Sequence, residues 1–454
     1  MNQSQGTSVK VGSSTLLASA ILASLGSFLF GFDTAVINGT TDSLRAVFHL
    51  TDNTLGFTVA SALLGTMVGS LIVGRPADWW GRRKVLGLLA GLFLISSVGC
   101  AGAWNWYALL FFRWLGGVAV GAASVACPVY ITEIAPAKRR GVLVAVSQLN
   151  IVIGVLLSYL SNYLVVRFIG ADNTVIWRWM FGVMILPSAV FLVAAFYIPE
   201  SPRWLVKQGR SPEAANVLVR LGHPEPQTEL AEIQSSLKEE MSGPHQRLFQ
   251  RKYLKPLLLA FMIAAFNQLD GINAVTYYSA DIFRMTGASN TSALMQTIMV
   301  GLTNLVLTLI AMVLIDRVGR KALLLVGSVT FVLSHSLAAW VFQTHAQGWV
   351  VMVAMAGIVG SHAYSQGAVV WVCINEVLPN AVRASGSAVA CCLLWILDIA
   401  VSWSFPVVAG KAGAYAFGFF AVMMVVQFFM VLKYFPETKG VSLEELQRRL
   451  GVEA

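Results

Sequence analysis

Charged residues are scarce in this chain. Asp, Glu, Lys and Arg together make up only 12% of its 454 residues, against about 25% in soluble globular proteins. Hydrophobic residues make up 57% and gather in runs of roughly 20, the length that crosses a bilayer as a helix. The shortage of charge excludes an ordinary soluble fold, and the apolar runs predict an all-α membrane protein embedded in a lipid bilayer.

Cysteine is scarce as well. The five cysteines all lie in apolar segments and lack the spacing of a zinc site, so we expect buried thiols, no metal and no cofactor. The apolar segments contain no nucleophile–base cluster, which makes a membrane enzyme the least favoured class. Only Lys10 precedes the first apolar run, and no small-residue cleavage site follows it. This indicates a first membrane helix and not a removed signal peptide.

The apolar residues fall into twelve segments that leave one long polar stretch. The segments are roughly 13–38, 54–74, 84–103, 107–134, 142–167, 178–198, 253–284, 292–315, 322–343, 348–377, 384–410 and 413–434. They predict twelve transmembrane helices in two six-helix bundles, at 1–198 and 253–435. The polar stretch at 199–252 is then a cytoplasmic linker with short helices, and 436–454 is a cytoplasmic tail.

The basic residues are unevenly distributed along this pattern. With the N-terminus placed in the cytoplasm, the termini and the even-numbered loops hold 25 of the 31 Lys and Arg. Because basic loops stay on the cytoplasmic side, we expect a multi-pass protein of the cell membrane with both termini in the cytoplasm. The same asymmetry accounts for the net charge of +9 without a nucleic-acid partner.

Two charged motifs recur at nearly the same offset. Asp78 recurs as Asp316, 238 residues further on (316 − 78). Glu133, with an arginine seven positions later, recurs with the same arginine spacing as Glu376, 243 residues further on (376 − 133). Such an internal repeat indicates duplication, and parallel six-helix repeats are typical of transporters that rock around a central site.

Several motifs together resemble one family. They are the Asp-x-x-Gly-Arg-Arg type of loop in both halves, Arg113-x-x-Gly116-Gly117, Pro199–Arg203, Gln268-x-x-Gly271-x-Asn273 and Pro436–Gly440. With them the chain resembles the sugar porter family of the major facilitator superfamily, in particular bacterial proton-coupled monosaccharide symporters. The resemblance implies a monomeric symporter of a hexose or pentose with a proton, working by alternating access.

Charged residues at the cytoplasmic helix ends form the first candidate group. The resemblance implies that they make salt bridges between the halves that hold the carrier outward-open; alternatively they only fix topology. The group comprises Asp78, Arg82, Glu133, Arg140, Glu200, Arg203, Asp316, Arg320, Glu376 and Arg383.

Asp33 in the first apolar segment and Arg113 in the fourth are the candidates for proton coupling. Ionisable residues within the membrane are rare and functional by default. Burial and a neighbouring cation act oppositely on a carboxylate, so such a pair suits a proton carrier. The resemblance implies the same, since proton-coupled relatives have Asp at this position and facilitative carriers tend to have Asn. The alternative is a static ion pair.

Amides and aromatic residues are the candidates for the sugar site, because amides both donate and accept hydrogen bonds and sugar C–H faces pack on indole rings. The alternative for the amides is hydrogen bonding between helices. By resemblance the candidates are Gln148, Asn267, Gln268, Asn273, Tyr277, Asn304, Trp371 and Trp395.

The sequence departs from the family at positions that bear on this site. Asn267 stands where the family usually has Gln, and Val155 replaces a second Gln often found one turn after Gln148. Asp270 replaces a small neutral residue and Asp398 an amide. The two acids bind hydroxyl groups, take part in coupling or face water, and the identity of the sugar stays open.

Other functions remain as alternatives. They are an uncoupled sugar uniporter, a polyol carrier, a non-sugar efflux carrier and a sugar sensor. An efflux carrier would be expected to lack the Gln-x-x-Gly-x-Asn motif, and a sensor usually has long cytoplasmic tails.

Overall fold

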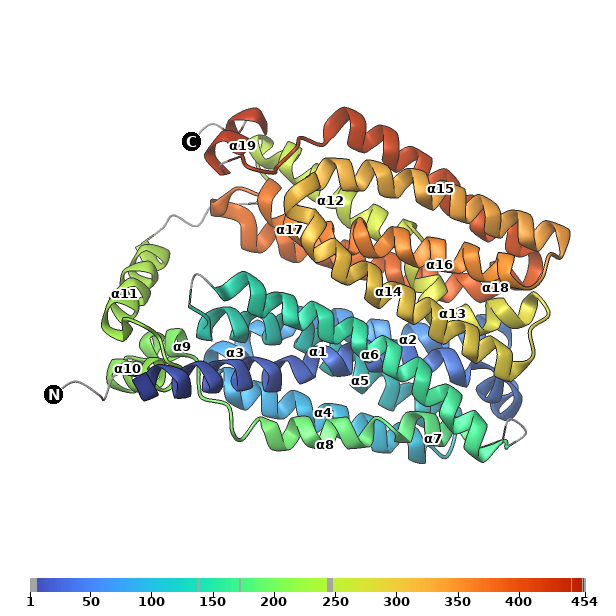
Figure 1. The fold of residues 1–454 in the computed structure, drawn as a ribbon, viewed down its shortest axis with the longest axis horizontal. Helices are drawn as coiled ribbons and strands as arrows, with labels where there is room; N and C mark the ends of the chain where they lie inside the picture. Colours follow the sequence, from blue (N-terminus) through green and yellow to red (C-terminus); the bar gives the residue numbers. More distant parts are fainter. Residues whose placement is uncertain are drawn as a thin grey trace. The chain divides into compact units, whose positions relative to one another are not determined.

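The computed structural model describes residues 6–136, 139–170, 173–242, 248–441, 443–450 and 452. The side chains at 6–13, 239–242, 316, 380, 443–444 and 449 lie outside this description. The described residues are helical and contain no strand (Figure 1). This agrees with the predicted all-α membrane fold.

The helices follow the predicted order. The first part of the chain forms α1 (Gly6–Phe48), α2 (Asp52–Ile72), α3 (Gly74–Trp80), α4 (Arg82–Gly102), α5 (Trp106–Ile134), α6 (Arg140–Ile169), α7 (Ile176–Gly182) and α8 (Ile185–Ala194). The polar stretch forms α9 (Pro202–Lys207), α10 (Ser211–Arg220) and α11 (Pro226–Ser242). The remainder forms α12 (Leu254–Leu269), α13 (Ile272–Met285), α14 (Asn290–Val318), α15 (Arg320–Thr344), α16 (Trp349–Tyr364), α17 (Gln366–Val377), α18 (Arg383–Tyr434) and α19 (Leu443–Leu450).

The number of membrane helices depends on how interrupted helices are counted. Ten spans of the described residues are long and apolar enough to cross a membrane. One of them, α18, contains a non-helical residue at Ala412 (φ −162°, ψ 83°) and is two successive helices. α16 and α17 are each too short to count, but they follow one another across a break at Ser365. Counted in this way, the described helices give the predicted twelve crossings.

Contacts divide the chain into two compact units. Unit 1 comprises Met1–Asp33, Gly65–Gly154 and Phe181–Pro244, and unit 2 comprises Thr34–Leu64, Val155–Met180 and His245–Ala454. This division differs from the predicted one, because one end of α1, α2, α6 and α7 groups with the second half of the chain. The bundle boundaries at 198, 252 and 435 therefore stay a prediction.

In unit 1, α4 packs along α5 and α8 (Figure 1). α2 and α5 come into backbone contact, since a Cβ on Gly121 would lie 1.9 Å from the carbonyl oxygen of Thr66. Small residues at such crossings are typical of helix packing in lipid, where burial of apolar surface does not drive association. This close packing fixes α5, which contains Arg113, against its neighbours.

In unit 2, α15 packs along α16 and α18, and α12 packs along α17 and α18. Two of its membrane helices are broken. Gly271, between α12 and α13, has φ +75°, a backbone conformation that favours glycine. Ser365 separates α16 from α17. Both breaks interrupt apolar helices and place polar residues inside the unit.

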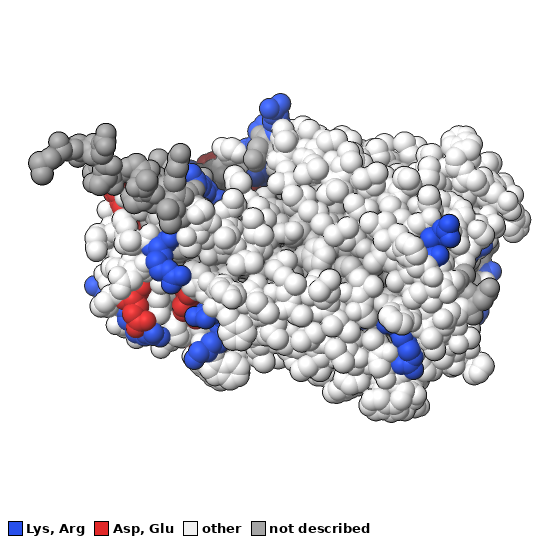
Figure 2. All heavy atoms as spheres, turned by 60° about the horizontal axis from the view of Figure 1, so that its bottom comes forward, with Lys and Arg blue, Asp and Glu red and all other residues white. Residues whose placement is uncertain are grey.

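The outer surface of the helices is apolar. On the face shown in Figure 2, Lys and Arg lie toward both ends and Asp and Glu toward the left end, and the stretch between shows none. Leu186 on α8 is 73% exposed, and Val190 and Val193 of the same helix are also exposed. An exposed apolar surface of this extent is unusual for a soluble protein and fits contact with lipid.

Candidate functional site

The structure brings Asp33 and Arg113 together inside unit 1. Arg113 Nη1 lies 3.3 Å from both carboxylate oxygens of Asp33, and both side chains are buried. The guanidinium also lies over the ring of Phe181 on α7, 5.6 Å from its centre. Charge-assisted N–H···O bonds are usually about 2.7–2.9 Å long. The pair is therefore held by charge but lacks the short bonds of a tight structural bridge.

Glycine makes room for this pair. Gly116 follows Arg113 on α5, and a Cβ there would lie 3.6 Å from Asp33 Oδ1 and 2.4 Å from Ser96 Oγ. Ser96 Oγ in turn donates to the carbonyl oxygen of Phe112. The Arg113-x-x-Gly116 spacing thus lets α4 and α5 approach one another beside the buried carboxylate.

Three of the predicted sugar residues form one hydrogen-bonded chain across the break between α12 and α13. Gln268 Nε2 donates to Asn267 Oδ1 at 3.0 Å, and Asn273 Nδ2 donates to Gln268 Oε1 at 2.7 Å. Asn267 and Gln268 are buried, and Asn273 is half-buried. Because each amide both donates and accepts, these bonds can be exchanged for bonds to sugar hydroxyl groups.

The other predicted sugar residues lie on several helices. Tyr277 is buried on α13, one turn after Asn273. Asn304 is half-buried on α14, Trp371 on α17 is 44% exposed, and Trp395 on α18 is buried. All of these belong to unit 2, whereas Gln148, half-buried on α6, belongs to unit 1.

The two unexpected acids are both completely buried in unit 2. Asp270 Oδ2 lies 2.7 Å from His362 Nδ1, and its Oδ1 accepts the backbone N–H of Ile272 at 2.9 Å. Asp398 Oδ1 accepts a hydrogen bond from Ser402 at 2.9 Å. Burial argues against the simplest of the three roles left open by the sequence, an acid that only faces water.

In unit 1, the charges predicted to be cytoplasmic are centred on Arg82. Its Nε and Nη2 donate to the two carboxylate oxygens of Glu133, both at 2.8 Å, and its Nη1 donates to Asp78 at 3.1 Å. Glu200 accepts the backbone N–H of Arg82 at 2.8 Å. Burial acts to raise the pKa of Asp78, but hydrogen bonds from Lys207 and Arg82 outweigh it and hold that pKa below its ordinary value.

Unit 2 repeats the arrangement more loosely. Arg320 Nη2 lies 3.4 Å from Glu376, and Glu437 accepts the backbone N–H groups of Arg320 and Lys321 at 3.0 and 3.1 Å. Glu437 thus does in the second half what Glu200 does in the first. The motif of Glu437 was apparent in the sequence, but this role was not predicted from it. The offset from Glu200 (437 − 200 = 237) was the available signal.

The remaining members of the cytoplasmic group are dispersed. Arg140 is exposed, Arg203 donates to a serine of α11 at 3.3 Å, and Arg383 donates to the carbonyl oxygen of Leu378 at 3.2 Å. The side chain of Asp316 lies outside the described residues. The ion pairs given above join residues of one half, so salt bridges between the halves stay a prediction.

A polar contact between α1 and α13 was not expected from the sequence. Asn38 Nδ2 donates to the carbonyl oxygen of Thr276 at 2.9 Å and to Ser279 Oγ at 2.7 Å, and Asn38 Oδ1 accepts the backbone N–H of Ala280. Tyr159 on α6 donates to the same carbonyl of Thr276. An amide in an apolar run was the only signal, and a sequence does not show which helix it faces.

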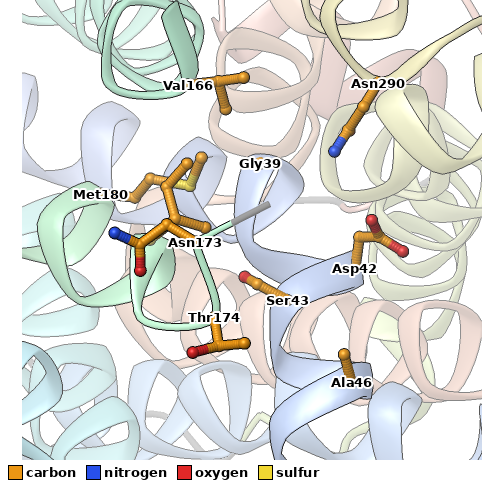
Figure 3. Close-up of a pocket in the computed structure, with 10 residues that line it drawn as sticks. Gly39, Asp42, Ser43, Ala46, Val166, Asn173, Thr174, Met180 and Asn290 are labelled. Carbon is orange, nitrogen blue, oxygen red and sulfur yellow. The ribbon is translucent and has the colours of Figure 1, made fainter. Parts of the chain in front are cut away.

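Unit 2 also contains a small cavity of about 120 Å³ between α1, α6, α7 and the start of α14 (Figure 3). Asp42, Ser43 and Asn290 are among the residues that line it. Ligand pockets are usually about 300–1,000 Å³ in volume. None of the predicted sugar residues lines this cavity, so it is not the predicted sugar site.

Comparison with known proteins identifies the family. The family model described as "Sugar (and other) transporter" matches residues 19–450. The chain belongs to this family, within the sugar porters of the major facilitator superfamily. It is therefore a multi-pass membrane protein that transports sugar, and not an enzyme.

Individual relatives match over nearly the full length. The chain is 35% identical to the D-xylose-proton symporter of Escherichia coli K12, covering 96% of each chain. It is 36% identical to the arabinose-proton symporter of Bacillus subtilis 168, covering 94% of this chain and 93% of that one. A structure of the E. coli xylose transporter XylE in a partially occluded inward-open conformation matches with a TM-score of 0.84 at 33% identity, over 95% of this chain and 100% of that chain.

Proposed function

We propose that this chain is a monosaccharide:proton symporter of the cell membrane, with both termini in the cytoplasm. The observation that supports it most is the buried pair of Asp33 and Arg113, an acid and a base without short bonds between them. Relatives at similar identity are named as proton symporters of xylose, arabinose and galactose, which supports both the proton and a pentose or hexose as substrate.

The proton acts through Asp33. Protonation removes its charge, and with it the attraction that holds Arg113 Nη1 at 3.3 Å. Release of the carboxyl group from Arg113 favours sugar binding and allows α1 and α5 to separate, and the loaded carrier then changes the side to which it opens. Loss of the proton on the other side restores the pair. Transport of sugar is in this way tied to movement of a proton down its gradient.

Sugar recognition falls to the second half. The chain of Asn267, Gln268 and Asn273 offers both donors and acceptors, and Trp371 and Trp395 supply aromatic surface. Tyr277, Asn304 and, from the first half, Gln148 complete the proposed set of contacts. The cytoplasmic ion pairs stabilise one state of the carrier. The two six-helix bundles comprise 1–198 and 253–435, and the carrier works as a monomer.

The test is uptake into proteoliposomes with an imposed pH gradient, with D-xylose, L-arabinose, D-glucose, D-galactose and a polyol as substrates. We expect accumulation of at least one monosaccharide above its outside concentration only when the gradient is present. The Asp33→Asn variant should lose this accumulation. Asp42→Asn is the matched control, because Asp42 lies on the same helix but is exposed.

Two results would contradict the proposal in different ways. Accumulation by Asp33→Asn equal to that of the wild type would leave a sugar carrier whose coupling does not use Asp33. Equilibration without accumulation by the wild type would favour the alternative, an uncoupled uniporter.

A further inference from the structure

A second buried acid–base pair lies in unit 2, apart from Asp33 and Arg113. The side chain of Asp270 is 0% exposed and its Oδ2 lies 2.7 Å from Nδ1 of His362, whose side chain is 18% exposed. The other oxygen of Asp270 accepts the N–H of Ile272. Ionisable side chains inside a membrane bundle are costly to bury and are functional candidates for that reason.

The acid of this pair occupies the place in the second half that Asp33 occupies in the first. The offset from Asp33 to Asp270 (270 − 33 = 237) is the same as that from Glu200 to Glu437 (437 − 200 = 237). Each acid lies on the first membrane helix of its half, and each base lies on the fourth. Both halves therefore have a buried acid on the first helix and a basic side chain on the fourth, although His362 lies further along its helix than Arg113, at an offset of 249 residues (362 − 113).

The pair also joins the two broken helices of unit 2. Asp270 ends α12, immediately before Gly271 and the start of α13. His362 lies in the last turn of α16, its carbonyl oxygen accepts the N–H of Ser365 at the break, and a Cβ on Gly367 would lie 3.0 Å from its ring. The contact between Asp270 and His362 thus ties one helix break to the other.

The sugar amides flank the same break. Gln268 lies two residues before Asp270 and Asn273 three residues after it, and the bond between their side chains spans the break. Any change in the Asp270–His362 contact therefore acts on the spacing of these two amides.

Two further ionisable groups, from other helices, face the pair in the described residues. His335 on α15 has Nε2 2.8 Å from the carbonyl oxygen of Asp270, and its ring is 0% exposed between Phe331 and Phe420. Asp398 on α18 interacts electrostatically with Asp270. His335 contacts the backbone at the helix break and is fully buried, whereas His362 contacts the carboxylate and is partly exposed.

The number of bound protons decides whether the pair holds together. When the pair has taken up one proton, the Asp270 carboxylate accepts a hydrogen bond from the charged imidazolium of His362. A second proton, taken from water onto the carboxylate, produces a neutral acid beside a charged imidazolium, and the attraction between opposite charges is lost. Both oxygens of Asp270 already accept a donor, Oδ2 from His362 Nδ1 and Oδ1 from the N–H of Ile272. An O–H formed on either oxygen therefore competes with one of these donors and weakens the contact. Imidazole is the side chain that ordinarily changes charge between pH 5 and 8.

We propose that Asp270 and His362 form a second proton-binding site of the carrier, which opens on uptake of a second proton and then weakens sugar binding. This rests on the proposed transport of a monosaccharide. The two proton sites act with opposite sign: protonation of Asp33 favours sugar binding, and double protonation of Asp270 and His362 opposes it. Sugar affinity should therefore pass through a maximum and fall on both the acid and the alkaline side.

The test is the pH dependence of the dissociation constant, measured by calorimetry on the full-length protein in detergent with D-xylose, L-arabinose, D-glucose and D-galactose. One linked proton changes the dissociation constant by up to about tenfold per pH unit. The wild type should show both limbs. The double variant Asp270→Asn with His362→Gln keeps a donor facing an acceptor but cannot titrate, and it should lose the acid limb alone. Asp33→Asn should lose the alkaline limb alone.

The outcomes separate the two proposals. An acid limb that persists in the double variant, or is absent from the wild type, overturns the second site and leaves the proposed symport intact. A purely structural pair would lower affinity equally at every pH and leave the acid limb in place. If the double variant does not fold, Asp270→Asn alone, which removes the carboxylate that takes the second proton, must lose the acid limb, and its retention overturns the inference. Loss of neither limb in Asp33→Asn counts against the coupling residue only.

Discussion

Gly271 sets the geometry of the proposed sugar site although it has no side chain. Its φ of +75° turns the chain from α12 into α13, which brings Gln268 and Asn273 within hydrogen-bonding distance of each other. Asp270, the residue before it, owes its contact with His362 to the same turn. One backbone conformation therefore positions both the amide chain and the second acid.

We expect Gly271→Ala to destabilise the protein and to weaken sugar binding. An alanine in the left-handed conformation costs about 1–2 kcal/mol, and its Cβ would lie 2.8 Å from the ring of Phe420. The midpoint of thermal unfolding in detergent should fall, and the dissociation constant for the transported sugar should rise by about tenfold, which is 1.4 kcal/mol. The matched control is Gly418→Ala, since nothing lies within 4 Å of a Cβ there. Equal unfolding midpoints for the two variants would refute this role of Gly271.

At the scale of the element, α13 is held at its start and in its middle. The break at Gly271 ties its start to α12, and Asn38 and Tyr159 bind its middle from α1 and α6. These side-chain bonds tie α13 to two other helices of unit 2 and oppose its local opening.

Replacing Asn38 should release α13. Asn38→Ala removes two bonds that the amide donates and one that it accepts, and a buried hydrogen bond contributes about 1 kcal/mol. We expect faster hydrogen–deuterium exchange in 272–285 with little change in α15. Ser43→Ala is the control on the same helix, because Ser43 donates to the carbonyl oxygen of Thr40 within α1. Unchanged exchange in α13 would show that the Asn38 contacts do not restrain it.

At the scale of the whole molecule, the two halves have equivalent ion pairs at the helix ends predicted to be cytoplasmic, and these ion pairs differ in length. Arg82 binds Glu133 through two bonds of 2.8 Å, whereas Arg320 reaches Glu376 at 3.4 Å. In both halves a glutamate accepts the first N–H groups of the following helix. The repeat has kept its geometry more closely in the backbone contacts than in the ion pairs.

This inequality predicts unequal effects of equivalent substitutions. Arg82→Gln leaves the largely buried Glu133 without its bidentate partner, and removing one member of such a pair costs about 3–5 kcal/mol. Arg320→Gln breaks a longer and more exposed contact with Glu376, so it should lower stability by less than Arg82→Gln. Unfolding midpoints of the two purified variants measure the difference. The expectation fails if Arg320→Gln is as destabilising as Arg82→Gln.

Much of the fold follows from the sequence because lipid imposes simple rules. Long apolar runs have to be helical in a membrane, so the helices and their order were predictable. The pair of Asp33 and Arg113 could be anticipated, since charges buried in apolar helices need a partner. The helix breaks at Gly271 and Ser365 could not be predicted from the sequence, because both lie inside continuous apolar segments.

The parts that escaped prediction depend on how helices face one another. Nothing in an apolar run shows that Asn38 turns toward α13 or that His362 turns toward Asp270. Glu437 was overlooked for another reason: its motif was treated as a family signature and not compared with Glu200. The grouping of the ends of α1, α2, α6 and α7 with the second half depends on contacts distant in sequence.

The same loop motif precedes α4 at Gly81 and α15 at Gly319, and this repeat has an evolutionary consequence. Each half brings its own helix-capping glutamate, its own arginine and its own buried acid and base. A chain of six crossings ends on the side of the membrane on which it began. Fusion of two copies of such an ancestral chain therefore required only a connection along one surface, and the polar stretch with α9, α10 and α11 is that connection.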